Sequence, residues 1–235
     1  MFWLDPLYLI LVLPAVLFAL IASASVNSTF EKFTKQLSSR RLSGAEAARR
    51  VLDAHGLQSV QIRRTSGKLT DHYDPRDNTI YLSDAVHDNT STAAIGVAAH
   101  EAGHAVQHAT HYLPIKIRSA IIPATNIGSR LAVPLVLLGL LFGAWNGNYM
   151  LAYVGVACFS LTAIFQLVTL PTEFNASRRA MSALENEGIL TRDELHGARK
   201  VLTAAAMTYV AALAVSLAQL LRILLMVAGN SRRRN

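Results

Sequence analysis

The sequence predicts a mainly α-helical membrane protein that also contains a small β-sheet. Hydrophobic residues make up 52% of the chain and charged residues only 16%, against about 25% charged in a typical soluble domain. The apolar residues gather in four long stretches, and the segments with strand character lie in a polar region between the first and the second stretch. We therefore expect about four transmembrane helices and a polar domain outside the bilayer.

The net charge and the single cysteine restrict the function less than the hydropathy does. The net charge is +7, but basic residues flank transmembrane helices for topological reasons. Nucleic acid is therefore a weak second explanation, and we expect membrane lipid and no nucleic acid as a partner. Cys158 is the only cysteine, so no disulfide can form within the chain.

The first apolar stretch, Leu7 to Val26, is long enough to cross a bilayer. About 20 residues at a rise of 1.5 Å cover about 30 Å, the thickness of the hydrocarbon layer. The alternative is a secretory signal peptide, because Ala22-Ser23-Ala24 resembles a cleavage site. The six residues MFWLDP before the stretch contain no basic residue, and we therefore expect a retained anchor over residues 1–26.

The second and third stretches predict a transmembrane helical hairpin. They cover residues 131–145 and 151–170, and only Asn146-Gly147-Asn148 interrupts them, where the Asn-Gly pair is a strong turn signal. The first arm is short, so we expect it to begin near Ile127, with Arg130 extending its charge toward the interface.

The fourth stretch, residues 203–228, is the most irregular. It contains Arg222, which is costly in lipid and is expected to face protein or the interface. If the stretch crosses the bilayer, Arg232, Arg233 and Arg234 lie outside the cell. This placement would break the positive-inside rule, so either the stretch does not cross fully or the tail is an exception.

Basic residues predict that the polar domain faces the cytoplasm. They follow the first stretch and flank the hairpin, whereas the hairpin turn has none. These residues are Lys32, Lys35, Arg40, Arg41, Lys116, Arg118, Arg178 and Arg179. We therefore expect a multi-pass protein of the cell (cytoplasmic) membrane.

The polar region after the first stretch carries signals of both helix and strand. Ser43 and Glu46 form a capping-box pattern at the start of a helix that ends at Gly56. Residues 59–64 and 79–82 have strand character, and the segment DPRDN between them predicts a turn.

A second helix in this region contains the motif His-Glu-x-x-His. Residues 97–108 read VAAHEAGHAVQH, and either Asp88 or Thr90 is expected to cap a helix that runs to about Ala109. Residues four apart in a helix point the same way, so His100 and His104 can share one zinc ion.

Two of the three residues between these histidines also favour a metal site. Glu101 can take a proton from a water on the zinc without being a ligand itself. Gly103 costs about 1 kcal/mol relative to alanine in a helix, which predicts the close approach of another backbone. The alternative, an incidental match, is less favourable because buried histidine and glutamate each need a partner.

A catalytic zinc needs a third protein ligand, and the geometry of the hairpin favours Glu173. The acidic residues beyond the motif are Glu173, Glu185, Glu187, Asp193 and Glu194. Two crossings return the chain to the side that it left, where Glu173 is expected near the start of a helix opened by Pro171. The alternative is a first-turn carboxylate that only complements the helix dipole.

Other polar residues near the motif carry weaker signals. His108 and His111 could assist at the site or stabilise an oxyanion, or they could be surface polar groups. Arg178 and Arg179 could orient Glu173, bind a substrate carboxylate, or serve as interfacial basic residues.

Three sequence blocks resemble the YugP-type neutral zinc metallopeptidases of bacterial membranes. The blocks are YDPRDNTIYLS, GVAAHEAGHAVQHA and LPTEFNASRRA, and the likeness runs from about residue 70 to residue 183. The resemblance implies a zincin-like catalytic domain with His100 and His104 as zinc ligands and Glu101 as the base. It supports Glu173 as the third ligand, and it implies that a strand over residues 79–82 pairs with an extended substrate.

A looser resemblance joins residues 173–177 to the Glu-x-x-x-Asp element of HtpX-like and prenyl-protein (CAAX) proteases. Here Ser177 stands in the place of that aspartate. The carboxylate that would orient a histidine ligand is therefore absent, and the sequence does not predict which residue orients that histidine instead.

The function expected from these features is a membrane-embedded zinc-dependent metalloendopeptidase that acts on membrane or unfolded proteins near the bilayer. An intramembrane zinc protease is the first alternative, although it would need an Asp from another span and the spans contain none. A non-catalytic membrane scaffold with a structural zinc is the second, and a transporter is the third.

The corresponding domain organisation has five segments. The expected segments are an anchor over residues 1–26, a zincin-like catalytic region over 27–118, a helical hairpin over 119–170, a helix with the third ligand over 171–202, and an apolar helix with a basic tail over 203–235.

Overall fold

The structure is a computed structural model that describes residues 5–232, and the chain divides into two compact units. The membrane unit contains the chain up to residue 21, residues 117–170 and the chain from residue 208 onward. The α/β unit contains residues 22–116 and 171–207. The first four residues, together with Arg233 and Arg234 of the predicted tail, lie outside the described residues.

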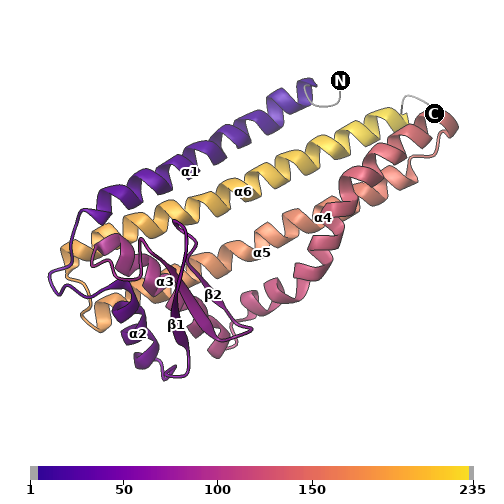
Figure 1. Ribbon diagram of the computed structural model, residues 1–235. Helices are drawn as coiled ribbons and strands as arrows, with labels where there is room; N and C mark the ends of the chain where they lie inside the picture. Colours follow the sequence, from indigo (N-terminus) through magenta and orange to yellow (C-terminus); the bar gives the residue numbers. More distant parts are fainter. Residues whose placement is uncertain (1–4, 233–235) are drawn as a thin grey trace. The chain divides into compact units, whose positions relative to one another are not determined.

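The membrane unit is built from long helices. A short π-helical turn η1 (Tyr8–Val12) precedes α1 (Leu13–Thr34), and α4 (Leu113–Asn146), α5 (Met150–Asn186) and α6 (Arg192–Arg232) follow later in the chain (Figure 1). Each of the four long helices reaches into the α/β unit at one end.

The predicted helical hairpin is α4 and α5, joined by the turn at Gly147, whose φ is +79°. The two helices approach closely near this turn, because a Cβ on Gly139 would lie 2.0 Å from the backbone nitrogen of Ala152. Only glycine permits this approach.

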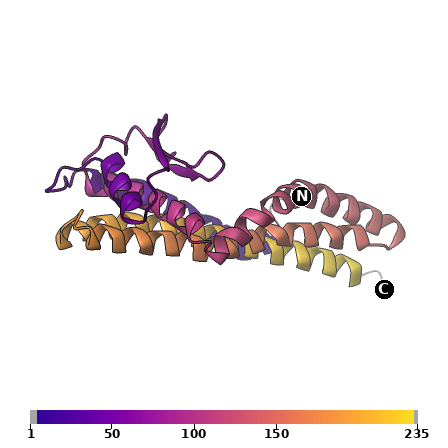
Figure 2. The same ribbon diagram turned by 90° about the horizontal axis from the view of Figure 1, so that it is seen from below.

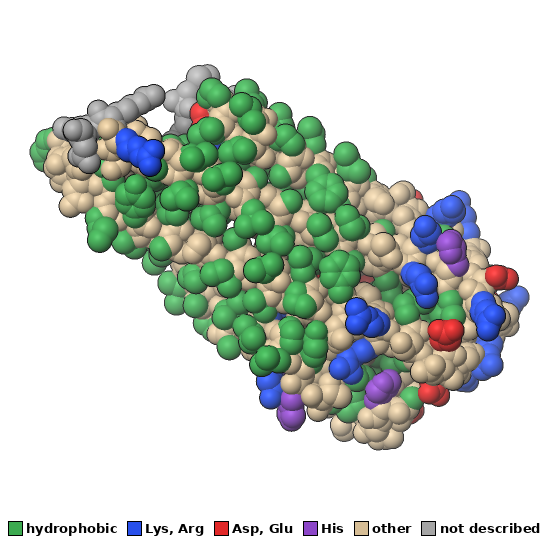
Figure 3. Space-filling view, turned by 180° about the vertical axis from the view of Figure 1, so that it is seen from behind, with side chains coloured by type: hydrophobic (Ala, Val, Ile, Leu, Met, Phe, Trp, Pro, Cys, Tyr) green, Lys and Arg blue, Asp and Glu red, His purple; other side chains and the backbone are tan. Residues whose placement is uncertain are grey.

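Four helices are long and apolar enough to cross a membrane, which confirms the predicted fold class. They are Tyr8–Thr34, Leu113–Asn146, Met150–Asn186 and Arg192–Arg232. Figure 3 shows hydrophobic side chains over most of the visible face of the membrane unit. Large apolar side chains such as Ile10, Leu141 and Leu167 are more than half exposed, as lipid-facing residues are.

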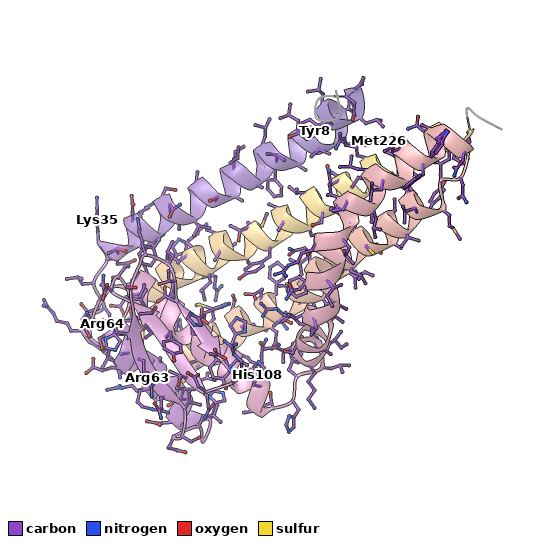
Figure 4. All side chains as sticks on the ribbon, turned by 45° about the vertical axis from the view of Figure 1, so that its right-hand side comes forward. Tyr8, Lys35, Arg63, Arg64, His108 and Met226 are labelled. Atoms are coloured by element: carbon purple, nitrogen blue, oxygen red, sulfur yellow. The ribbon has the colours of Figure 1, made fainter. Side chains whose placement is uncertain are left out.

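Arg222 of α6 faces protein, one of the two environments that were predicted for it. Its side chain is 1% exposed, and its Nη2 donates to Oδ2 of Asp5 at 2.7 Å. The Tyr8 ring lies 5.3 Å from the guanidinium. Figure 4 labels Tyr8 of η1 and Met226 of α6. The ion pair therefore joins the segment just before η1 to α6 within the membrane unit.

The α/β unit begins with α2 (Gly44–Ala54), and the predicted capping box is confirmed. The Ser43 hydroxyl accepts from the backbone N–H of Glu46, and the Glu46 carboxylate accepts from the backbone N–H of Ser43 at 2.7 Å. The helix ends before Gly56, whose φ is +72°.

The sheet has three strands, β1 (Gln61–Thr65), β2 (His72–Asp74) and β3 (Thr79–Ser83), in the order β1-β3-β2. β3 pairs with β1 in parallel and with β2 in antiparallel fashion. The prediction that the strand at residues 79–82 pairs with a substrate is therefore wrong, since both edges of β3 are occupied within the sheet.

The motif helix α3 (Thr92–Ala109) starts later than predicted. Its N-cap is Ser91, whose hydroxyl accepts from the backbone N–H of Ala94, and not Asp88 or Thr90. Figure 2 shows α3 lying between the sheet and the ends of α5 and α6 that belong to the α/β unit. Its small residues make this possible: a Cβ on Gly96 would lie 3.1 Å from the Ala198 Cβ of α6.

The helices of the membrane unit extend beyond the apolar stretches from which they were predicted. Pro171 does not open a new helix, because it lies inside α5, and Pro123 and Pro134 lie inside α4. Membrane helices tolerate proline where neighbouring groups satisfy the freed carbonyl. Glu173 is consequently a mid-helix residue, which rules out a first-turn role at the helix dipole.

Candidate metal centre

α3 brings His100 and His104 together on one face. The two imidazole rings are one helical turn apart, with centroids separated by 4.7 Å and planes close to perpendicular. Their side chains are 14% and 12% exposed. Both rings are therefore largely buried but keep a small exposed area.

Glu173 of α5 supplies a carboxylate between the two rings. Its Oε2 lies 3.3 Å from Nε2 of His100 and 3.6 Å from Nε2 of His104, and the side chain is 3% exposed. One donor atom from each residue lies within 4.8 Å of the other two. The structure thus brings together the three residues that the sequence predicts as metal ligands.

The spacing of these atoms fits a zinc ion. Donor atoms at about 2.0–2.1 Å from a tetrahedral zinc lie about 3.3–3.4 Å from one another. The two measured distances from the Glu173 oxygen are close to this value. Two nitrogen donors and one oxygen donor are also a set that zinc binds in catalytic sites.

Gly103 allows α5 to approach α3 closely enough for this geometry. A Cβ at Gly103 would lie 2.7 Å from the carbonyl oxygen of Ala176, a separation that real Cβ atoms do not show. The prediction that another backbone lies close to Gly103 is confirmed. Since Ala176 is three residues after Glu173, this approach sets the distance from the carboxylate to the histidines.

The Nδ1 atom of each histidine, on the ring edge away from Glu173, is hydrogen-bonded. Nδ1 of His100 lies 3.1 Å from Oγ of Ser177, and Nδ1 of His104 lies 3.0 Å from Oε1 of Gln107. Ser177 therefore contacts a predicted ligand from the position that the aspartate holds in the Glu-x-x-x-Asp element.

The charges around His104 favour its protonated form. Burial lowers the pKa of this imidazole, but the hydrogen bond to Glu173 and the charges of Glu173 and Glu101 together raise the pKa above its ordinary value. The same negative potential favours a bound cation, which would take the place of the proton.

Glu101 is 7% exposed and lies between the two histidines in the sequence of α3. Consecutive residues of a helix point about 100° apart, so its side chain leaves α3 beside the histidine face. This placement is compatible with its predicted role as the base.

The remaining histidines lie outside the ligand group. His108, labelled in Figure 4, is half-buried near the end of α3 and lies against the Tyr73 ring of β2 with centroids 5.5 Å apart. His111 is exposed and has a φ of +55°. The described residues contain only one group of three or more metal-binding side chains, and neither residue belongs to it.

The two arginines after Glu173 differ in their contacts. Arg179 donates from Nε to Oδ1 of Asn175 at 2.8 Å, and its guanidinium lies 5.9 Å from the Tyr112 ring. Arg178 is exposed. Gln107 and Asn175 were not predicted as site residues. The spacing of three between His104 and Gln107 indicates that these two residues share a helix face.

Comparison with known proteins supports the metal site that the geometry indicates. The family described as "Putative neutral zinc metallopeptidase" matches residues 8–228. The "Putative membrane protease YugP" of Bacillus subtilis (strain 168) is 44% identical over 229 residues, which cover 97% of this chain and 100% of the relative. No solved structure matches the chain.

Proposed function

Because the chain belongs to the family of neutral zinc metallopeptidases, we propose that it is a membrane-embedded zinc-dependent metalloendopeptidase. Its substrates would be membrane proteins or unfolded segments near the bilayer surface. One observation carries the proposal: the Glu173 Oε2 lies 3.3 Å and 3.6 Å from the Nε2 atoms of His100 and His104, and one donor atom from each residue lies within 4.8 Å of the other two. Three protein ligands leave the fourth corner for water and substrate, as in catalytic zinc sites.

Zinc, when bound, supplies a Lewis acid that polarises the scissile carbonyl and lowers the pKa of a water molecule. The residues of the chain hold that ion in place. His100 and His104 donate neutral nitrogen atoms from one rigid helix, and Glu173 adds a negative charge from a second. That charge makes a buried cation less costly, because an isolated ion is strongly disfavoured away from water.

Glu101 is the proposed general base. Its carboxylate accepts a proton from the attacking water and delivers that proton to the leaving amine. Its buried position next to His100 in α3 supports this role, because little bulk water competes for its carboxylate.

The substrate would pair with β2 and not with β3. β2 is an edge strand of the sheet, and its Tyr73 packs against His108 of the zinc helix. An extended peptide that adds to a sheet edge gains main-chain hydrogen bonds without sequence preference, which suits a protease of unfolded segments.

The proposed location is the cell membrane, with the α/β unit on the cytoplasmic side. Basic residues at the ends of the helices support this, among them Lys32, Lys35 and Lys116. In a Cys158→Ser background, a cysteine placed at the exposed Lys68 should react with an impermeant reagent only after the membrane is opened. Reaction in intact cells would reverse the orientation.

The decisive experiment compares Glu101→Gln with the unaltered protein, both purified in detergent and loaded with zinc. The variant should keep one zinc per chain and lose peptidase activity toward an unfolded protein by 100-fold or more, about the contribution of a general base. Glu185→Gln changes an exposed carboxylate of α5 in the same way and should leave both measurements unchanged.

Two other results would redirect the proposal. Normal activity in Glu101→Gln would remove Glu101 from the mechanism. Tight zinc binding without hydrolysis of any peptide by the unaltered protein would favour the non-catalytic scaffold with a structural zinc.

A further inference from the structure

We propose that Gln107 is a positioning residue of the metal centre: its buried amide fixes the orientation and tautomer of His104 and ties α5 to α3 on both sides of Glu173. This inference rests on the proposed zinc site. It adds a requirement of this chain that the His-Glu-x-x-His motif does not contain.

The Gln107 side chain is fully buried and uses every polar group that it has. Its Oε1 lies 3.0 Å from Nδ1 of His104. Its Nε2 donates to the backbone carbonyl of Thr172 at 2.7 Å and to Oδ1 of Asn175 at 3.0 Å. An amide has two N–H donors, and both are satisfied by acceptors on α5.

Arg179 determines the orientation of this amide, because it hydrogen-bonds to Asn175, which in turn hydrogen-bonds to Gln107. A guanidinium can only donate, so the atom of Asn175 that Arg179 Nε contacts at 2.8 Å is the oxygen. That oxygen and the Thr172 carbonyl are both acceptors, so Gln107 must turn its NH₂ group toward them. Rotating the amide by 180° would place an oxygen 2.7 Å from a carbonyl oxygen.

The tautomer of His104 is then determined. Because Gln107 presents its oxygen to the ring, Nδ1 of His104 must carry a hydrogen and donate it. In the neutral ring, Nε2 is therefore the atom with the free lone pair, and Nε2 is the atom that faces Glu173 at 3.6 Å. The ligand atom is thus prepared for a metal before the metal arrives.

His100 lacks this constraint. Its Nδ1 contacts the hydroxyl of Ser177 at 3.1 Å, and a hydroxyl can either donate or accept. Of the two histidine ligands, only His104 has its tautomer set by a network that ends in a donor-only group.

The same amide also positions the third ligand. Thr172 precedes Glu173 by one residue and Asn175 follows it by two, and both accept from one nitrogen atom of Gln107. The network therefore fixes α5 against α3 at the point where the carboxylate must reach the histidines.

The test compares two substitutions of Gln107 by their zinc affinity, measured by competition with a chelating dye on the full-length protein in detergent. Gln107→Met keeps the volume and removes all three hydrogen bonds, and it should weaken zinc binding about 10- to 100-fold, the range found for residues that orient metal ligands. Gln107→Glu keeps the acceptor for His104 but loses the donors to α5, and it should weaken binding less than Gln107→Met does.

A second readout separates positioning from general stability. The absorption spectrum of bound Co²⁺ reports ligand geometry, and it should change in Gln107→Met at metal concentrations that saturate the site. Gln36→Met is the control, because Gln36 is another partly buried glutamine that hydrogen-bonds at the start of α3, with the Thr92 hydroxyl. This control should match the unaltered protein in both affinity and spectrum.

The outcomes separate this inference from the proposed function. Equal zinc affinity in the unaltered protein and Gln107→Met would overturn the positioning role while leaving the peptidase proposal intact. Equal losses in Gln107→Met and Gln107→Glu would overturn the assignment of the His104 tautomer to the Gln107 oxygen. Absence of zinc binding by the unaltered protein would instead reject the metal centre itself.

Discussion

The membrane unit and the α/β unit each bury charged groups, and they do so in different ways. In the membrane unit, Arg222 is 1% exposed and meets the carboxylate of Asp5 at 2.7 Å, so the two charges cancel within the protein. In the α/β unit, the Glu173 carboxylate is 3% exposed and faces two imidazoles at 3.3 Å and 3.6 Å. The Glu173 charge helps to raise the pKa of His104, but neither imidazole carries the permanent charge of an arginine.

The difference distinguishes a structural ion pair from a ligand site. An arginine is always charged and cannot give up its place to a metal, so the Asp5–Arg222 pair is complete as it stands. Two ring nitrogens and a carboxylate oxygen present lone pairs that converge, and such a group is complete only with a cation. Substitutions in the two places should consequently have opposite signatures: loss of stability in one and loss of metal in the other.

The largest expected effect follows from Glu173→Gln. The amide keeps the size of the side chain but removes the charge and one good oxygen ligand, so zinc affinity should fall 100-fold or more and peptidase activity should disappear. The folded protein should be no less stable without zinc, because a buried charge has been removed. Metal analysis after dialysis and thermal unfolding in detergent measure the two effects.

Glu185→Gln again serves as the matched control on α5 and should retain zinc. Zinc retained at full stoichiometry in Glu173→Gln would show that another residue completes the site.

Asp5→Asn should have the reverse signature. It leaves the buried Arg222 guanidinium without its counter-charge, which costs about 3 kcal/mol of unfolding free energy for a buried pair, while zinc binding stays unchanged. Because Asp5 itself is partly exposed, this figure is an upper value. Thermal unfolding of the zinc-loaded protein in detergent measures it.

The double variant Asp5→Asn with Arg222→Met removes both charges and should recover most of the lost stability. An Asp5→Asn protein as stable as the unaltered one would mean that the pair contributes nothing to the association of the first and last helices.

Gly103→Ala should affect both properties by smaller amounts. The added Cβ would meet the Ala176 carbonyl oxygen at 2.7 Å, so α5 must move away from α3 at a cost of about 1–3 kcal/mol. The shift displaces Glu173, and zinc affinity should fall more steeply than stability. Isothermal titration with zinc and chemical unfolding give the two numbers.

Gly229→Ala, where an added Cβ meets nothing within 4 Å, is the control and should be neutral or slightly stabilising. Unchanged zinc affinity in Gly103→Ala would show that the close approach of the helices does not set the ligand geometry.

Local sequence patterns predicted a large part of this molecule. The capping box at Ser43, the turn at Gly147 and the convergence of His100 and His104 all depend on residues a few positions apart, where helix and turn geometry is nearly fixed. Glu173 was also found, because a hairpin must return the chain to its starting side.

The features that the sequence did not predict are those set by packing between segments far apart in the chain. The position of β3 in the middle of the sheet depends on β1 pairing in parallel across a crossover, which the period of the strand does not reveal. Pro171 predicts the start of a helix but lies inside α5, because a proline is tolerated within a helix only where the surroundings compensate for it. Gln107 escaped notice because its acceptors lie 65 and 68 residues away.

The most direct test of the central claim is a zinc K-edge X-ray absorption spectrum of the purified protein with one zinc per chain. The predicted spectrum shows only nitrogen and oxygen neighbours at about 2.0–2.1 Å, with the outer-shell scattering of two imidazoles, and Glu173→Gln should alter it. A sulfur neighbour at about 2.3 Å, scattering from fewer than two imidazoles, or a spectrum unchanged by Glu173→Gln would contradict the metal centre described by His100, His104 and Glu173.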